Sequence, residues 1–343
     1  MEVQPFGNSP ASLYTLKNKL GTEVILTDIG ASVVRILLKD KSGGIVDIAL
    51  GYDSPERYFH NDSAYGAIVG RFANRIGGAS FLLHGQRYLL DANEGKNVLH
   101  GGNDKYFHRL WSAQPDAAGN GVTFHLLSPD GDQGMPGRAQ ISVRYALDDE
   151  NRLTLQYRAV SDQDTYFNLT NHCYFNLDGH NAGDVGGQTL LLHCDNFVAI
   201  DDAFIPTGEI LSVKGTPMDF TQPKPIGRDI DADDAQIRLG NGYDHCFVLN
   251  CPSLQKPFAT VFSEKTGITM EAFTDLPGVQ FYSGNNMGRD TGEKGGKYLF
   301  RGGFCLETQF FPDTPNKPQF PCDLFPAGKP FESETVYRFH TQP

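Results

Sequence analysis

The sequence predicts an all-β protein built from antiparallel strands, with only a few short helices. Three observations support this prediction. The chain has 38 glycines and 20 prolines among its 343 residues, and this density interrupts the backbone too often for long helices. Short apolar segments recur at intervals of roughly ten residues, separated by stretches rich in Gly, Pro and Asp. The segments also do not alternate with helical patterns, which favours a sandwich or barrel over β-α-β units.

The clearest strand runs from Arg138 to Leu147, where apolar and polar residues alternate as on a half-buried strand. Its apolar positions are Ala139, Ile141, Val143, Tyr145 and Leu147. A polar turn, Asp148–Asn151, follows, and the alternation resumes between Leu153 and Ala159. The two segments therefore predict an antiparallel hairpin.

The same pattern predicts further short strands along the whole chain. They are expected at Ser12–Leu16, Glu23–Thr27, Val33–Leu38, Val122–Leu127, Thr189–His193, Phe258–Ser263, Ile268–Phe273, Val279–Tyr282, Phe304–Thr308 and Thr335–His340. Helical character is expected only at Ser54–Phe59 and near Gln222–Ile230. No linker or low-complexity block divides the chain, so we predict a single domain spanning residues 1–343.

The charge of the chain argues against two classes of partner. Lys and Arg total 29 and Asp and Glu total 41, a net charge of −12, which repels the phosphates of nucleic acids and of anionic membranes. No run of 18 apolar residues is present, and the segment Met1–Phe6 lacks the features of a secretion signal. The six cysteines form no C-x-x-C pair, as expected of buried thiols in a cytoplasmic protein.

Several common catalytic signatures are missing from the sequence. It contains no G-x-G-x-x-G between a strand and a helix, no G-x-x-x-x-G-K-[ST], no G-x-S-x-G and no H-E-x-x-H. Nucleotide-binding, serine-hydrolase and zinc-protease functions therefore lose their usual support.

Four segments carry polar residues where a structural strand or turn has no need of them. They are Gly70–Ile76, Asn97–Gly102, Asn168–Leu177 and Gly303–Asp313. The first holds two arginines and an asparagine, the second a histidine before a double glycine, the third three asparagines and a histidine, and the fourth a lone glutamate among aromatic residues. These segments are the candidates for a functional site.

With two further segments they resemble the aldose 1-epimerase, or galactose mutarotase, family. The matching words are GR-x-ANRI, LHGG, TNH-x-YFNLDGH, GYDH, PG-x-QFYSGN and CLETQFFPD-x-PN, in the family's order and over essentially the whole chain. The resemblance implies a large antiparallel β-supersandwich. It also implies an isomerase that interconverts the α and β anomers of D-galactose or D-glucose, with neither cofactor nor metal.

The resemblance assigns roles to particular residues. Glu307 is expected to be the general base and His172 the general acid. The sugar is expected to be held by Asn74, Arg75, His100, Asp244 and Gln280, with Tyr174 and Phe281 lining the pocket. The segment Asn103–His108 departs from the Gly-Phe-Asp-Lys stretch that the family often has here, so one edge of the pocket is expected to differ, and the resemblance leaves substrate preference open.

The chemistry explains the need for this pair. Ring opening removes the proton of the anomeric hydroxyl and gives one to the ring oxygen. A glutamate, with an ordinary pKa of about 4.3, suits the first task, and a histidine near 6.5 suits the second. Rotation about the C1–C2 bond and closure by the same two groups in reverse then yields the other anomer.

Three alternatives stay open at this point. Asp244 and Glu307 are also the kind of carboxylate pair that a glycosidase uses. The residues His100, His172, Asp244 and Glu307 include metal-ligand types, but no short ligand spacing. A sugar-binding protein without turnover would keep the same pocket. Of the two arginines in the first segment, we expect Arg75 to bind substrate and Arg71 to be structural. The sequence does not choose between galactose and glucose, or between a monomer and a homodimer.

Overall fold

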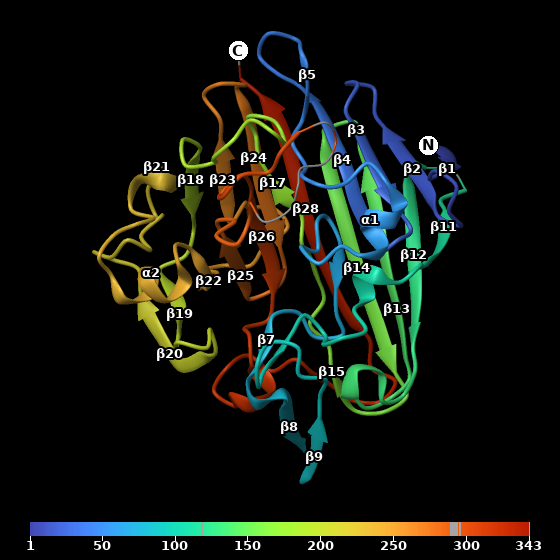
Figure 1. The fold of residues 1–343 in the computed structure, drawn as a ribbon, viewed down its shortest axis with the longest axis vertical. Helices are drawn as coiled ribbons and strands as arrows, with labels where there is room; N and C mark the ends of the chain where they lie inside the picture. The colour runs from blue at the N-terminus through green and yellow to red at the C-terminus, as the bar shows by residue number, and fades with distance from the viewer. Residues whose placement is uncertain (118, 289–293, 295, 343) are drawn as a thin grey trace.

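The computed structural model describes residues 1–117, 119–288, 294 and 296–342. Strands dominate it, and all the named strand pairs run antiparallel. Figure 1 shows long strands side by side through the centre of the molecule, with only short helical pieces among them. The predicted all-β, antiparallel class is confirmed.

The largest sheet has nine strands. In spatial order they are β11 (Ser112–Pro115), β12 (Gly121–Ser128), β13 (Ala139–Leu147), β14 (Arg152–Ser161), β28 (Phe331–Thr341), β24 (Ile268–Thr274), β23 (Ala259–Phe262), β18 (Thr189–Leu192) and β21 (Lys224–Pro225). The predicted hairpin is β13–β14, with Leu147 paired to Leu153. Its buried and less buried residues alternate as the sequence pattern requires.

A second sheet of six strands carries Tyr174, Asp244, Gln280 and Glu307 of the residues singled out above. Its order is β17 (Tyr174–Phe175), β26 (Phe304–Gln309), β25 (Gly278–Tyr282), β22 (Asp244–Val248), β19 (Asn196–Ile200) and β20 (Pro206–Ser212). Strand β26 is central to the site, and all six of its residues are buried.

The N-terminal part of the chain forms a third sheet, and short ladders fill the spaces between. The third sheet is β1 (Glu2–Pro5), β2 (Ser12–Lys17), β3 (Glu23–Thr27), β4 (Ser32–Lys39) and β5 (Ile45–Asp47). The ladders pair β6 (Ile68–Val69) with β16 (Thr170–Asn171), β7 (Arg75–Ile76) with β10 (Val98–Leu99), β8 (Ser80–Leu83) with β9 (Gln86–Leu89), and β15 (Thr165–Tyr166) with β27 (Leu324–Phe325).

The helices are few and short, as predicted, but one of the two expected positions is wrong. Helix α1 (Pro55–Phe59) lies within the predicted segment Ser54–Phe59. The stretch Gln222–Ile230 instead forms β21 and a 3₁₀ turn, Ile226–Arg228. Pro223 and Pro225 explain this, because proline lacks the N–H that a helix needs and disfavours helical backbone in the residue before it.

The second α-helix among the described residues, α2 (Ala235–Gly240), begins where sequence reasoning saw no helix. The Asp234 carboxylate accepts hydrogen bonds from the backbone N–H groups of Gln236 and Ile237, which caps the first turn. Asn241, in the left-handed conformation, ends the helix. None of the described helices combines the length and apolarity that crossing a bilayer requires.

A continuous apolar core joins the three sheets. One cluster of buried side chains runs from Tyr14 on β2 to Phe339 on β28 and includes residues from all three. Hydrogen bonds cross between sheets within it, from Tyr145 Oη to the carbonyl of Ala31 (2.8 Å) and from Tyr337 Oη to the carbonyl of Leu306 (3.0 Å). All six cysteines are unpaired; four are buried as expected, whereas Cys251 and Cys322 are exposed.

Candidate active site

The alternation of β26 determines which of its side chains face the site. Leu306 points into the core, so Cys305 and Glu307 point to the opposite face of the strand. Strand β25 places Gln280 opposite Glu307 and Tyr282 opposite Cys305. Three neighbouring strands, β22, β25 and β26, thus present polar groups on one face of the six-stranded sheet.

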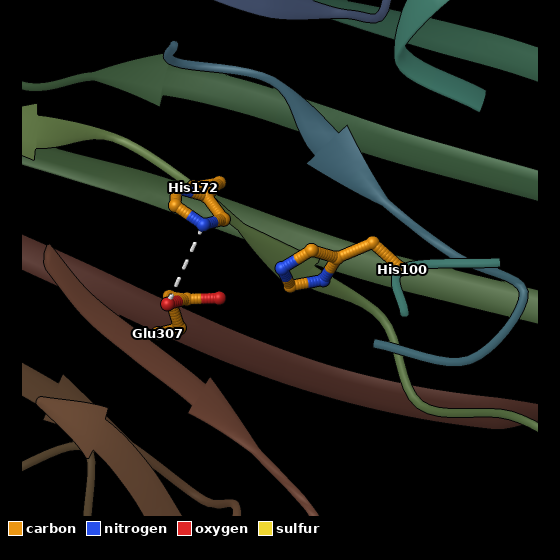
Figure 2. A group of neighbouring side chains, drawn as sticks. All are labelled: His100, His172 and Glu307. Atoms are coloured by element: carbon orange, nitrogen blue, oxygen red, sulfur yellow. Dashed lines mark ion pairs between the residues drawn. The ribbon is translucent and has the colours of Figure 1, made fainter. Parts of the chain in front are cut away.

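His172 lies between the two-residue strands β16 and β17. Its backbone is fixed on both sides, since its N–H donates to Ala67 (2.8 Å) and its carbonyl accepts from Gly66 (3.1 Å). The imidazole Nε2 lies 3.6 Å from Oε1 of Glu307, and the ring nitrogen faces the carboxylate in Figure 2. The ring stacks on Tyr174 at 5.0 Å between centroids. Sequence positions 135 residues apart are therefore brought into contact by the sheet.

The second histidine, His100, reaches the same place from a turn after β10 (Figure 2). Asn74 and His100 hold each other: the N–H of His100 donates to the carbonyl of Asn74 (3.1 Å), and the N–H of Asn74 donates to Nδ1 of His100 (3.2 Å). Both residues have a positive φ. The next position, 101, must be a glycine, because a Cβ there would lie 2.3 Å from the carbonyl oxygen of Gly70.

Arg75 is a buried cation with three neighbours. Glu94 accepts hydrogen bonds from Nε (2.7 Å) and Nη2 (2.9 Å), and Nη1 lies 3.9 Å from Oδ2 of Asp244. The guanidinium also lies over the ring of Phe204, 4.6 Å from its centroid. Asp244 in turn accepts a hydrogen bond from the Gln280 side-chain amide at 2.7 Å.

These groups surround one pocket with a volume of about 230 Å³. Ligand pockets for drug-sized molecules occupy about 300–1,000 Å³, so this one suits a smaller ligand. Seven of the nine residues expected from the sequence line it: Asn74, Arg75, His100, His172, Tyr174, Asp244 and Glu307. Lys105 and Phe107 line it as well, so the divergent segment Asn103–His108 does border the pocket.

Burial pushes the pKa values of the central pair in opposite directions. Desolvation raises the pKa of Glu307 well above its ordinary value, Asp244 adds to the rise, and Arg75 opposes it. Desolvation lowers the pKa of His172 to about 4. Both shifts favour the neutral form of each side chain, a protonated Glu307 and an uncharged His172. The Oε2 of Glu307 has no hydrogen-bond partner among the described residues, which leaves an acceptor facing the pocket.

The cluster of His100, His172 and Glu307 also has the residue types of a metal site, with donor atoms within 4.8 Å of one another. The hydrogen bonding of His100 disfavours that use. Its Nδ1 accepts from the Asn74 backbone, so in the neutral ring the proton resides on Nε2. That nitrogen then offers a hydrogen, suited to a ligand oxygen, and not a lone pair for a metal ion.

Two expected residues are not in the lining of the pocket. Gln280 is buried beside Asp244, and its Oε1 has no partner among the described residues. Phe281 was expected in the pocket, and the structure corrects this: it is fully buried in the core, stacked on Tyr243 at 5.2 Å. The strand alternates, so placing Gln280 toward the site turns Phe281 away.

Several pocket residues were not predicted from the sequence, among them Asp62, Asn93, Asn286 and Met287, and Tyr282, the neighbour of Phe281, is one that the strand pattern could have revealed. The signal was available, because residues 280 and 282 share a face of any strand that presents Gln280 to the site. Its hydroxyl accepts a hydrogen bond from the N–H of Asn286 at 2.8 Å. Its ring lies edge-on to Tyr174, so two tyrosine rings border the pocket side by side.

Other polar residues of the four segments are structural. Arg71 is fully buried and donates to Ser128 Oγ (2.5 Å) and to the carbonyl of Pro136 (2.7 Å). Asn168, Asn171 and Asn176 all use their side-chain amides to bind backbone groups. These amides donate hydrogen bonds to backbone carbonyls of the irregular segments around the short strands, and buried polar groups require such partners.

Comparison with known proteins adds an independent line of evidence. The family model described as aldose 1-epimerase matches residues 12–338. Galactose mutarotase of Bos taurus is 38% identical over 339 residues, covering 97% of both chains. Aldose 1-epimerase of Escherichia coli K12 is 38% identical over 336 residues, covering 96% of this chain and 95% of the other.

Solved structures agree with this result. An aldose epimerase homologue from C. elegans superposes with a TM-score of 0.90 at 30% identity, covering 97% of this chain and all of the other. Galactose 1-epimerase from Lactobacillus acidophilus superposes with a TM-score of 0.86 at 30% identity, covering 100% of this chain and 98% of the other. With the site described above, these similarities establish that the chain belongs to the aldose 1-epimerase family, isomerases that interconvert the α and β anomers of a sugar.

Proposed function

We propose that this mutarotase acts on D-galactose and D-glucose, with Glu307 as general base and His172 as general acid. The observation that carries the proposal is the contact between Nε2 of His172 and Oε1 of Glu307, 3.6 Å apart in a pocket of small-ligand size. One proton shared between a base and an acid is what the reaction needs, since one is taken from O1 and one is given to the ring oxygen.

The proton transfers balance over a full catalytic cycle, so both side chains end in the protonation state in which they began. The reactive form places the shared proton on His172 and leaves Glu307 ionised. Glu307 takes the proton of the anomeric hydroxyl as His172 delivers its own to the ring oxygen, and the C1–O5 bond breaks to give the aldehyde. The pair is then neutral. After rotation about C1–C2, His172 takes the proton of the C5 hydroxyl and Glu307 returns one to O1. Each positioned group contributes about 10² to 10⁴ in rate.

The remaining residues have the right donors and acceptors to hold the sugar. Nη1 of Arg75 and the Nε2–H of His100 donate, whereas Asp244 accepts from hydroxyl groups. The Tyr174 and Tyr282 rings cover the apolar face of a pyranose. We infer an uncharged aldose, because Arg71 is not part of the pocket lining and Arg75 is already paired with Glu94, so neither guanidinium offers an unpaired charge to a phosphate.

Two alternatives are less well supported by the geometry. A glycosidase needs a second carboxylate that is free to act as acid or nucleophile, but Asp244 is held by Gln280 and faces Arg75. A binding protein without turnover has no use for Glu307, a buried carboxylate whose burial opposes its charged form.

We also propose that the chain is a single cytoplasmic domain, 1–343, acting as a monomer or homodimer without a cofactor. Its single-domain character is supported by the buried cluster that spans residues from Tyr14 to Phe339. Its cytoplasmic location is supported by the absence of cysteine pairing.

Polarimetry of freshly dissolved α-D-galactose and α-D-glucose tests the proposal. Wild type is expected to speed the approach to anomeric equilibrium, and Glu307→Ala and His172→Ala to lose most of that acceleration while keeping the native circular dichroism spectrum. A wild-type rate equal to that of buffer would refute the choice of sugars. Release of reducing sugar from a glycoside would instead favour the glycosidase alternative.

A further inference from the structure

Glu94 contributes to the site although sequence reasoning did not single it out. It lies in the turn between β9 and β10, where its N–H donates to the carbonyl of Asn97 (3.1 Å) and its carbonyl accepts from the N–H of Asn97 (3.0 Å). Oδ1 of Asn97 accepts in turn from the N–H of Gly78 (3.0 Å). The turn is therefore fixed at the backbone, and Glu94 projects from a defined position.

The carboxylate of Glu94 occupies one edge of the Arg75 guanidinium. It accepts from both Nε and Nη2, and the ring of Phe204 lies against a face of the same group. The remaining nitrogen, Nη1, is the one that approaches Asp244 across the pocket. A guanidinium is a rigid fork, so gripping two nitrogens fixes where the third one points.

We propose that Glu94 is a positioning residue: by binding Nε and Nη2 of Arg75, it aims Nη1 at the sugar and offsets the charge of the buried guanidinium. The inference rests on the proposed function, because it assigns the purpose of the fixed Nη1 to sugar binding. It adds to that function a residue outside the pocket lining that acts only through Arg75.

The first consequence concerns affinity. An arginine side chain has several rotatable bonds, and ordering it when the sugar arrives would cost binding free energy. Glu94 and Phe204 impose that order beforehand. Loss of the two hydrogen bonds between Arg75 and Glu94 is therefore expected to raise KM more than it lowers kcat, since Arg75 takes no part in proton transfer.

The second consequence concerns charge. Arg75 lowers the pKa of Glu307, whereas Asp244 raises it. Neutralising Glu94 leaves the positive charge of Arg75 without its partner, so the pKa of Glu307 is expected to fall. The groups that face or electrostatically couple to Glu307 from the surrounding elements are Arg75, His100, His172, Tyr174, Asp244, Cys246, Tyr282, Cys305 and Tyr337. Of these, Arg75 is the cation that Glu94 binds.

Two variants separate geometry from charge. Glu94→Gln keeps the shape and removes the charge, whereas Glu94→Asp keeps the charge but is one methylene too short to reach both nitrogens from a fixed turn. Glu332→Gln is the matched control, since Glu332 pairs with Arg158 on the exposed face of the nine-stranded sheet. It is expected to behave as wild type.

The measurements are KM and kcat by polarimetry across pH, and hydrogen exchange of the Arg75 Nε–H by NMR. For Glu94→Gln we expect KM to rise about tenfold or more, the alkaline limb of the kcat/KM profile to move to lower pH, and the Nε–H to exchange faster. For Glu94→Asp we expect the higher KM with an unmoved pH profile.

Wild-type kinetics for Glu94→Gln, or an equal loss at every pH with KM unchanged, would overturn the inference. The second result would indicate a structural role alone. The NMR measurement needs no sugar, so it keeps the two proposals distinguishable. A wild-type enzyme without activity on either sugar refutes the proposed function. An unchanged Nε–H exchange rate in Glu94→Gln refutes the proposed positioning of Arg75 by Glu94.

Discussion

Replacing both Glu307 and His172 is expected to cost no more activity than replacing either one. The reason lies in the proposed mechanism: Nε2 and Oε1, 3.6 Å apart, share one proton, and each transfer by one group requires the other in the same ring-opening event. The substitutions are Glu307→Gln and His172→Gln, singly and together.

The magnitude follows from this shared step. Each single substitution is expected to reduce the enzymatic rate by about 10² to 10⁴, equivalent to roughly 2.7 to 5.4 kcal/mol of transition-state stabilisation. Independent groups would multiply to about 10⁴ to 10⁸ in the double variant. Groups that act as a unit leave the double variant close to the slower single variant, so the coupling free energy is about as large as one single effect.

The assay is polarimetry with α-D-galactose, corrected for the buffer rate, with each variant checked by circular dichroism and thermal melting. His84→Gln is the matched control, because His84 forms an exposed pair with Asp164 and neither residue lines the pocket. If the logarithmic losses of the two single variants add in the double variant, the two groups act independently, and the shared-proton mechanism is wrong.

Four further outcomes are expected. Phe281→Leu should lower the free energy of unfolding by about 1–3 kcal/mol, as a large-to-small change in a packed core, and leave KM unchanged; a raised KM with unchanged stability would return Phe281 to the pocket. Glu307→Gln should gain thermal stability over wild type as pH rises above 4.5, since burial raises the pKa of Glu307 and the unfolded chain, which ionises first, is increasingly favoured at higher pH; a melting-temperature difference that does not change with pH would contradict this. The kcat/KM of wild type should fall as pH drops through about 4, because protonation of His172 leaves the pair with two protons and no base; a limb that persists in His172→Gln would belong to another group. Dialysis against EDTA should leave kcat/KM unchanged, because the His100 Nδ1 lone pair is already used by the Asn74 backbone; loss of activity restored by one added metal would show that the site uses it.

Much of the fold could be predicted because its information is local. The alternation from Ala139 to Leu147 identifies both the strand and its buried face, and it agrees with the burial found in the structure. The helix expected near Gln222–Ile230 failed for an equally local reason, the two prolines. Strands of two residues, such as β16 and β17, are too short to show any period, so only tertiary contacts reveal them.

The candidate site could be predicted only as far as the sequence motifs shared with the family identify its residues. Those motifs placed seven residues that line the pocket, but they could not say which of two adjacent residues faces it. Phe281 and Tyr282 exchange roles relative to the expectation because the direction of a strand's side chains depends on the sheet it joins. Glu94 was missed because its role depends on Arg75, a partner 19 positions away across a turn.

The sequence by itself determined the strand periodicity, the scarcity of helix and the residues that we propose as acid and base. These properties are local, since each depends on neighbouring residues or on side-chain chemistry. The tertiary structure alone decided that His172 meets Glu307, that Glu94 grips Arg75 and that burial shifts the pKa values of Glu307 and His172 in opposite directions. Those properties need groups from distant strands in one desolvated place, and only packing of the sheets supplies both proximity and exclusion of water.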